Sequence, residues 1–121
     1  MAKTYKEVIV WQKAHQLAIK IYKITKKFPP EEKFGLVSQM RRSAISVPSN
    51  IVEGYHRKNY KDALHFFNIS ESSLKELEYQ TLLSYDLNYL NKDEFSKIKN
   101  LQNEVGKLLT KWKQTYYKKQ Y

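Results

Sequence analysis

The apolar residues of this 121-residue chain recur at alternating intervals of three and four along most of its length. On an α-helix this spacing gathers them on one face, and it is the seam spacing of helices that pack together in a bundle. The chain has only three glycines and three prolines, so few turns are available to interrupt the pattern. We therefore expect a few long amphipathic helices within one domain.

Turn and capping residues divide the pattern into four stretches. The first ends at Phe28-Pro29-Pro30, because a residue before proline avoids the helical conformation. Short connections make successive helices antiparallel, so the predicted fold is all-α, an antiparallel up-down-up-down four-helix bundle. We expect a frayed tail after Tyr116. Cap-like pairs open the first, third and fourth helices: Thr4 with Glu7, Asn59 with Asp62, and Asn91 with Glu94. One domain spanning residues 1–121 is expected to contain helices at about 5–28, 31–57, 60–89 and 92–116.

The second stretch contains the segment SQMRRSAISVPSNIVEG, residues 38–54, which mixes seam residues with polar ones. One flank carries hydroxyl, amide, carboxylate and guanidinium groups that can form a network. Its small residues favour a close crossing by another helix, and the small polar middle of the third stretch makes that helix the expected neighbour. An arginine on such a seam needs a carboxylate, and the expected partners are Glu71, Glu76 and Glu78. We assign to a structural or interface network Arg41, Arg42, Pro48, Asn50, Glu53 and Arg57.

Positive charge is the clearest signal of a partner. The formal net charge is +10 and the isoelectric point is near 9.7, which makes acidic partners such as nucleic acid plausible. Lysines recur every seven residues along the outside of the first predicted helix, close enough together to contact phosphates of one RNA. The alternative interpretation is an ordinary solvated face. The predicted nucleic-acid-binding residues are Lys6, Lys13, Lys20, Lys23 and Lys27, with Lys107, Lys111 and Lys113 near the end of the chain.

Tyrosine is abundant, with ten copies in the chain. Five of these rings lie near basic residues, where a ring could stack on a base. Tyrosines of this kind also line subunit interfaces or the edge of a core, and that interpretation stays open. The five are Tyr55, Tyr60, Tyr116, Tyr117 and Tyr121.

Enzyme chemistry has little support in the sequence. None of the histidines, His15, His56 and His65, lies in a pattern that specifies a nucleophile and its base. Glu-x-x-His and Asp-x-x-His pairs flank the turn near residues 53–65, away from the helix middles where di-metal bundles hold their ions. The glycines are isolated, so no phosphate-binding loop is present. We expect no catalytic residue, no metal and no cofactor.

The chain has no cysteine, which is compatible with a reducing cytoplasm. No apolar run approaches membrane-spanning length, and the N-terminal MAKTYKEV lacks the apolar centre of a signal peptide. We therefore expect a soluble cytoplasmic protein with no membrane partner.

Four segments together carry a family resemblance: VWQKAHQLAIKIY, FPPEEKFGL, SQMRRSAISVPSNIVEG and LKELE. They resemble the bacterial four-helix-bundle proteins encoded in intervening sequences of large-subunit ribosomal RNA genes, over about Val8 to Trp112. The accessory protein of diversity-generating retroelements is similar. The resemblance implies a homopentamer, a ring of bundles. It carries over Arg41, Arg42, Pro48, Asn50, Glu53, Gly54 and Arg57, as structural or interface residues.

Taken with the charge, these features predict a non-enzymatic oligomeric bundle that binds structured RNA, either ribosomal RNA or its intervening sequence, through a basic surface. The alternative prediction is an assembly scaffold or adaptor that docks a protein partner on a homo-oligomeric ring.

Overall fold

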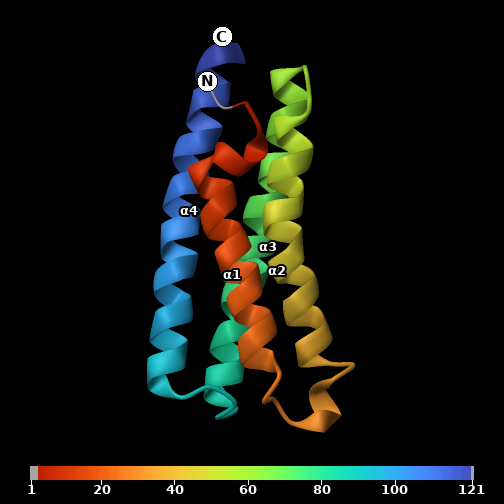
Figure 1. Cartoon of the computed structure of the whole chain (residues 1–121), viewed down its shortest axis with the longest axis vertical. Helices are drawn as coiled ribbons and strands as arrows, with labels where there is room; N and C mark the ends of the chain where they lie inside the picture. The colour runs from red at the N-terminus through yellow and green to blue at the C-terminus, as the bar shows by residue number, and fades with distance from the viewer. Residues whose placement is uncertain (1–2, 121) are drawn as a thin grey trace.

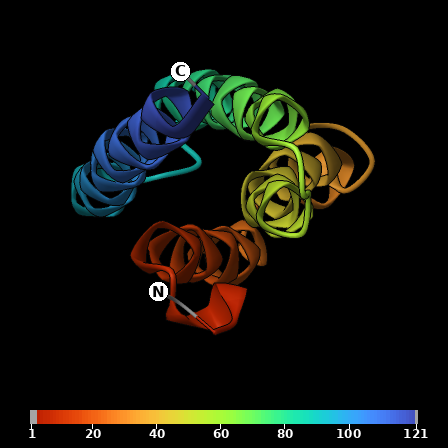
Figure 2. The ribbon, with the colours of Figure 1, turned by 90° about the horizontal axis from the view of Figure 1, so that it is seen from above.

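The computed structural model describes residues 3–120, and its four long helices form an antiparallel bundle (Figure 1). The helices are α1 (Ile9–Thr25), α2 (Leu36–Tyr55), α3 (Tyr60–Asp86) and α4 (Lys92–Gln120), with short 3-10 turns η1 (Tyr5–Glu7) and η2 (Pro30–Glu32). Seen from above, α1, α2, α3 and α4 follow one another around the core, and α1 also contacts α4 (Figure 2). The predicted all-α four-helix bundle is confirmed.

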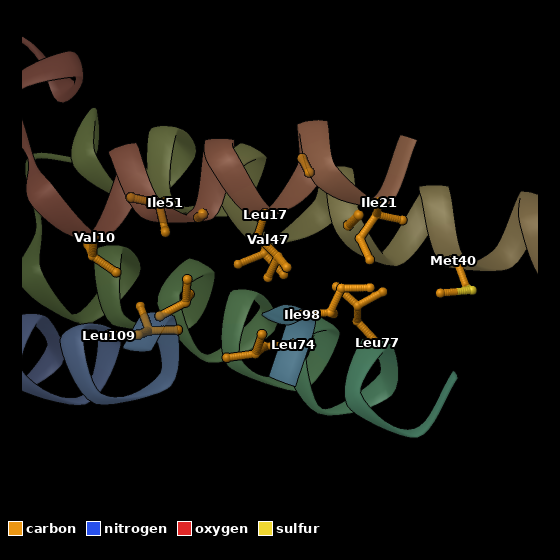
Figure 3. Packing of buried hydrophobic residues seen from close by; sticks show 14 of the residues in the cluster. Val10, Leu17, Ile21, Met40, Val47, Ile51, Leu74, Leu77, Ile98 and Leu109 are labelled. Carbon is orange, nitrogen blue, oxygen red and sulfur yellow. The ribbon is translucent and has the colours of Figure 1, made fainter. Parts of the chain in front are cut away.

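The core consists of the seam residues of all four helices, which meet along the bundle axis (Figure 3). Leu17 and Ile21 of α1, Val47 and Ile51 of α2, and Leu77 of α3 are completely buried. The α4 seam contributes the fully buried Ile98, Val105 and Leu109. Burial of such aliphatic side chains, at about 1.5–3 kcal/mol each, drives the packing of helices that would be marginal alone.

Two of the predicted helix starts have the expected capping bonds. The Asn59 side chain accepts hydrogen bonds from the backbone N–H groups of Lys61 and Asp62, at 2.8 and 3.2 Å. Asn91 and Glu94 form a reciprocal capping box, each side chain accepting from the other's backbone N–H, at 2.8 and 2.9 Å. The starts of α3 and α4 are therefore set by local sequence.

The first two predicted helices begin later than expected. Thr4 caps only the turn η1, and Val8 is extended and buried, so α1 begins at Ile9. The second prediction began at residue 31, but η2 comes first and α2 begins at Leu36. There the Glu32 side chain accepts from the Leu36 N–H at 3.3 Å and takes the role of a cap.

The other helix ends also differ from prediction. Asn88 has a φ of 64°, and the Tyr89 N–H donates back to the Ser84 carbonyl at 2.9 Å, which ends α3 at Asp86. The expectation of a frayed tail is wrong, because α4 stays helical to Gln120. The Tyr116 ring packs 4.8 Å from Phe67 and 5.6 Å from Tyr60, between ring centroids, and these contacts hold the last turns. Burial, followed by the nearby phenols of Tyr55 and Tyr60, raises the pKa of Tyr116.

Candidate nucleic-acid interface

The close crossing expected of α2 and α3 is present as a polar seam. Ser43 donates a hydrogen bond to Glu76 at 2.7 Å, and the hydroxyls of Ser46 and Ser73 lie 2.7 Å apart. Ser70 of α3 donates to the Val47 carbonyl of α2 at 2.8 Å. These short side chains allow the two backbones to approach while each buried hydroxyl keeps a partner.

The residues assigned to the polar network divide into an inner and an outer group. Asn50 donates to the Ser46 carbonyl at 2.8 Å and lies in the seam, next to the buried Pro48. Glu53 and Arg57 are exposed and pair with each other at 3.1 Å, one helical turn apart. The Arg57 guanidinium also lies 4.5 Å from the centre of the Phe66 ring.

The predicted partners of the arginines are wrong. Arg41 faces α1: its Nε donates to Thr25 Oγ1 at 3.0 Å and its Nη2 to the Tyr22 carbonyl at 3.1 Å. Arg42 is exposed, and among residues 3–120 it has no hydrogen-bond or ionic partner. The three carboxylates take other partners on α2, α3 and α4: Glu71 with Lys113, Glu76 with Ser43, and Glu78 with Lys75.

Three of the eight predicted RNA-binding lysines form ion pairs with a glutamate of another helix. Lys13 of α1 pairs with Glu104 of α4 at 3.0 Å, and Lys27, in the turn that follows α1, pairs with Glu94 of α4. Lys113 pairs with Glu71 of α3 at 3.2 Å, and its side chain is only 14% exposed. These lysines have a structural role that competes with phosphate contact. The hydrogen bond from Lys27, with a second from the Asn91 backbone, lowers the pKa of Glu94.

The other five, Lys6, Lys20, Lys23, Lys107 and Lys111, have no carboxylate within ion-pair distance in the described part of the chain. Lys20 and Lys23 border a groove between α1 and α4 that also contacts Leu101. Lys111 borders a second depression between these helices, beside Val10. Lys107 instead lies with Glu71 and Glu78 at the groove between α3 and α4. The structure thus brings some of the predicted lysines to the α1–α4 face and separates others from it.

A second group of lysines, which the sequence did not single out, lies at one end of the bundle. Lys58 and Lys61 come from the connection between α2 and α3 and the first turn of α3, and Lys118 and Lys119 from the last turn of α4. Figure 1 shows these two segments at the same end. We call these four lysines the basic end. The sequence signal that could have indicated this group of lysines is the position of Tyr60 and Tyr116 beside basic residues. Tyr121, another tyrosine named from the sequence, lies outside the described residues.

An apolar groove of about 590 Å³ runs between α1 and α2. Ile19 and Tyr22 line it from α1, and Ile45 and Val52 line it from α2. Trp11 and His15 stack on each other along its wall, with ring centroids 4.9 Å apart. Lys23 and Lys26 border it, and no carboxylate does.

Two kinds of site are absent from residues 3–120. No group of three or more His, Asp or Glu side chains there is placed to hold a metal ion. None of the helices in this range is both long enough and apolar enough to cross a membrane.

Comparison with known proteins gives a family and a fold. The family model of the 23S rRNA-intervening sequence protein matches residues 6–111. A crystal structure from Bacteroides thetaiotaomicron, of a protein of unknown function from the S23 ribosomal protein family, is similar with a TM-score of 0.81 and 27% identity. That match covers 88% of this chain and 96% of the other. Among curated proteins, none matches.

Proposed function

The chain belongs to the 23S rRNA-intervening sequence protein family, and from this premise we propose that it is a non-enzymatic, cytoplasmic protein that binds structured RNA. The RNA is ribosomal RNA or its intervening sequence. The observation that supports this most directly is the α1–α4 face, where Lys20, Lys23 and Lys111 have no carboxylate partner among residues 3–120. Lysines without partners on a protein of net charge +10 attract phosphates.

Binding of this kind reads charge and shape more than sequence. Each lysine that neutralises a phosphate releases a counterion, so the affinity falls steeply as salt is added. Contacts to the phosphate backbone position the protein on RNA without selecting a sequence. Lys13 and Lys27 are excluded from the primary contacts in this proposal because each would have to leave a glutamate of α4.

Fluorescence anisotropy of a labelled ribosomal RNA hairpin over a salt series tests the proposal. The variant combines Lys20→Gln, Lys23→Gln and Lys111→Gln. A matched control combines Lys33→Gln, Lys92→Gln and Lys99→Gln, three exposed lysines that line neither depression of the α1–α4 face. Loss of three contacts should lower the magnitude of the salt slope by about 2, and the control should keep it. Absence of wild-type binding at low salt contradicts the proposal.

We also propose that the protein is a homo-oligomer, and the family resemblance implies a pentamer. A homo-oligomer is also the basis of the alternative function, a scaffold that docks a protein partner. The observation that favours it is the α1–α2 groove, since apolar surface of this kind marks interaction sites. The exposed face of α3 carries Ile69, Glu76 and Tyr79, which offer apolar groups and a carboxylate to a basic, apolar groove. A second copy seated through α3 therefore suits the groove in shape and charge.

A further inference from the structure

The basic end is assembled by contacts between the two segments that form it. The Tyr60 ring packs edge-on against Tyr116 of α4, with centroids 5.6 Å apart. Lys119 Nζ lies 5.8 Å from the centre of the same Tyr60 ring. Lys58 and Lys61 flank Tyr60 in the chain, so one tyrosine from α3 brings lysines of both segments to one surface.

All four lysines of the basic end are exposed, and no carboxylate among residues 3–120 pairs with any of them. Acidic residues are present nearby, but Glu53 pairs with Arg57, four residues further along the chain. The second nearby carboxylate is the exposed Asp62. It belongs to the first turn of α3 and lies near the positive end of the helix dipole. Among the described residues, the local charge is therefore positive, and no carboxylate pairs with these lysines.

This arrangement contrasts with the lysines at the helix interfaces. Lys13 and Lys113 each join two helices through a glutamate, and Lys27 joins the turn after α1 to Glu94 of α4. The basic end gathers four like charges, and their mutual repulsion opposes folding. The contact between Lys119 and the Tyr60 ring is the interaction that offsets part of this repulsion. A binding partner with negative charge explains why the charges are gathered there.

The rings beside these lysines narrow the chemistry of the partner. Tyr60 is 39% exposed and Tyr117 is 44% exposed, so ring surface is accessible within a cationic patch. Aromatic rings with phosphate-binding lysines are the combination that holds unpaired nucleotides, with bases on the rings and phosphates on the cations. An anionic membrane would be better served by exposed aliphatic or tryptophan side chains at this end.

We propose that the basic end is a second RNA-contacting surface, which binds the phosphates of unpaired nucleotides through Lys58, Lys61, Lys118 and Lys119 and offers Tyr60 as a stacking platform. This inference rests on the proposed RNA-binding function and adds a site to it. The α1–α4 face contacts paired or folded RNA, and the basic end contacts a loop or a single-stranded segment.

The test compares two variants in which lysine is replaced by glutamine at three positions. The end variant combines Lys58→Gln, Lys61→Gln and Lys119→Gln. The control is the Lys33, Lys92 and Lys99 variant used above, in which Lys33 and Lys99 also lie near rings, at 5.4 Å from Phe34 and 5.9 Å from Phe95. Anisotropy is measured with a labelled hairpin carrying an eight-nucleotide loop, and with a fully paired RNA of equal phosphate number. Circular dichroism confirms that both variants stay folded.

We expect the end variant to bind the hairpin at least about tenfold more weakly, with a salt slope smaller by about 2. The control should change affinity by less than about threefold. Equal behaviour of the two variants, with wild-type binding intact, overturns the second site and leaves the proposed function standing. If the wild type binds neither RNA, both proposals fall. Binding to vesicles with 30% phosphatidylserine, but to no RNA, also overturns the inference.

Replacement of Tyr60 by leucine tests the stacking platform separately. The wild type should prefer the looped hairpin over the paired RNA, and Tyr60→Leu should reduce that preference about threefold or more, because stacking on an aromatic ring contributes about 1–3 kcal/mol per base. An unchanged preference overturns the role of the ring. Tyr5→Leu, which changes a half-buried tyrosine of the α1–α2 groove, serves as the control.

Discussion

Gly54 of α2 packs directly against the Phe67 ring of α3. A Cβ atom at this position would lie 2.3 Å from Cε1 of Phe67, a fully buried ring of α3. Because Phe67 is fully buried and also contacts Tyr116 and Trp112, a shift of its ring would disturb both neighbours. The residue is helical, so the glycine is required by the close approach and not by its backbone conformation.

We expect Gly54→Ala to destabilise the protein by about 1–3 kcal/mol, the usual cost of overpacking a core. Urea denaturation followed by circular dichroism measures the loss. Gly106→Ala is the matched control, because its Cβ would meet Leu74 at a comfortable 3.6 Å. That variant should be neutral or more stable by up to about 1 kcal/mol, since alanine favours a helix over glycine. Equal effects at the two glycines would contradict this account.

The adjacent residues Arg41 and Arg42 are expected to differ strongly in their contribution to the free energy of unfolding. Arg41→Ala removes two hydrogen bonds to the last turn of α1 and the contact with Tyr22, and should cost about 1–2 kcal/mol. Arg42→Ala changes an exposed side chain and should stay within about 0.5 kcal/mol. The same denaturation experiment compares the two variants. If Arg42→Ala lost more stability than Arg41→Ala in a monomeric sample, the contacts of Arg41 would contribute less than expected.

At the scale of helices, the ion pair between Lys27, in the turn after α1, and Glu94 of α4 makes stability depend on pH. The folded protein lowers the pKa of Glu94 below its ordinary value of 4.5 through Lys27 and the Asn91 backbone. The carboxylate therefore stabilises the fold above pH 4.5, and this contribution disappears as the pH falls through the lower pKa of the folded state.

Glu94→Gln should accordingly be less stable than the wild type by up to about 1 kcal/mol at pH 7, because the pair is partly exposed. The difference should vanish in acid. Denaturation at pH 7, 5, 4 and 3 measures it. In a Lys27→Gln background the same substitution should have a smaller pH-dependent effect, and an effect of undiminished size would mean that Lys27 does not act on Glu94.

Helices and seams could be predicted because their spacing records burial directly, as the fully buried Leu17, Val47 and Leu77 show. The side-chain partners between helices could not be predicted from the sequence. The recurrence of Lys13 and Lys27 places them on one face, but their glutamates become visible only once α4 lies against that face. The break at Val8 follows from the packing of an extended residue in the core, which no local signal marks. The basic end joins residues almost sixty positions apart.

At the scale of the whole molecule, self-association is expected to depend on the α1–α2 groove. Light scattering should give a mass several times the 14.5 kDa of one chain. Ile45→Glu places a charge in the groove and should yield monomers, whereas Leu87→Glu changes a residue of equal exposure, 45% against 44%, outside it. A wild type that is monomeric at micromolar concentration, or an Ile45→Glu variant that keeps the full mass, would contradict the proposed interface.

The first and last described residues, Lys3 and Gln120, lie at the same end of the bundle as the turn between α2 and α3 (Figure 1). Any affinity tag, fluorescent fusion or surface linkage placed at either terminus therefore crowds the basic end. The turn between α3 and α4, around Asn88, points to the opposite end of the bundle. Immobilisation through a cysteine introduced there, in a chain that has none of its own, would leave the basic end open to solution.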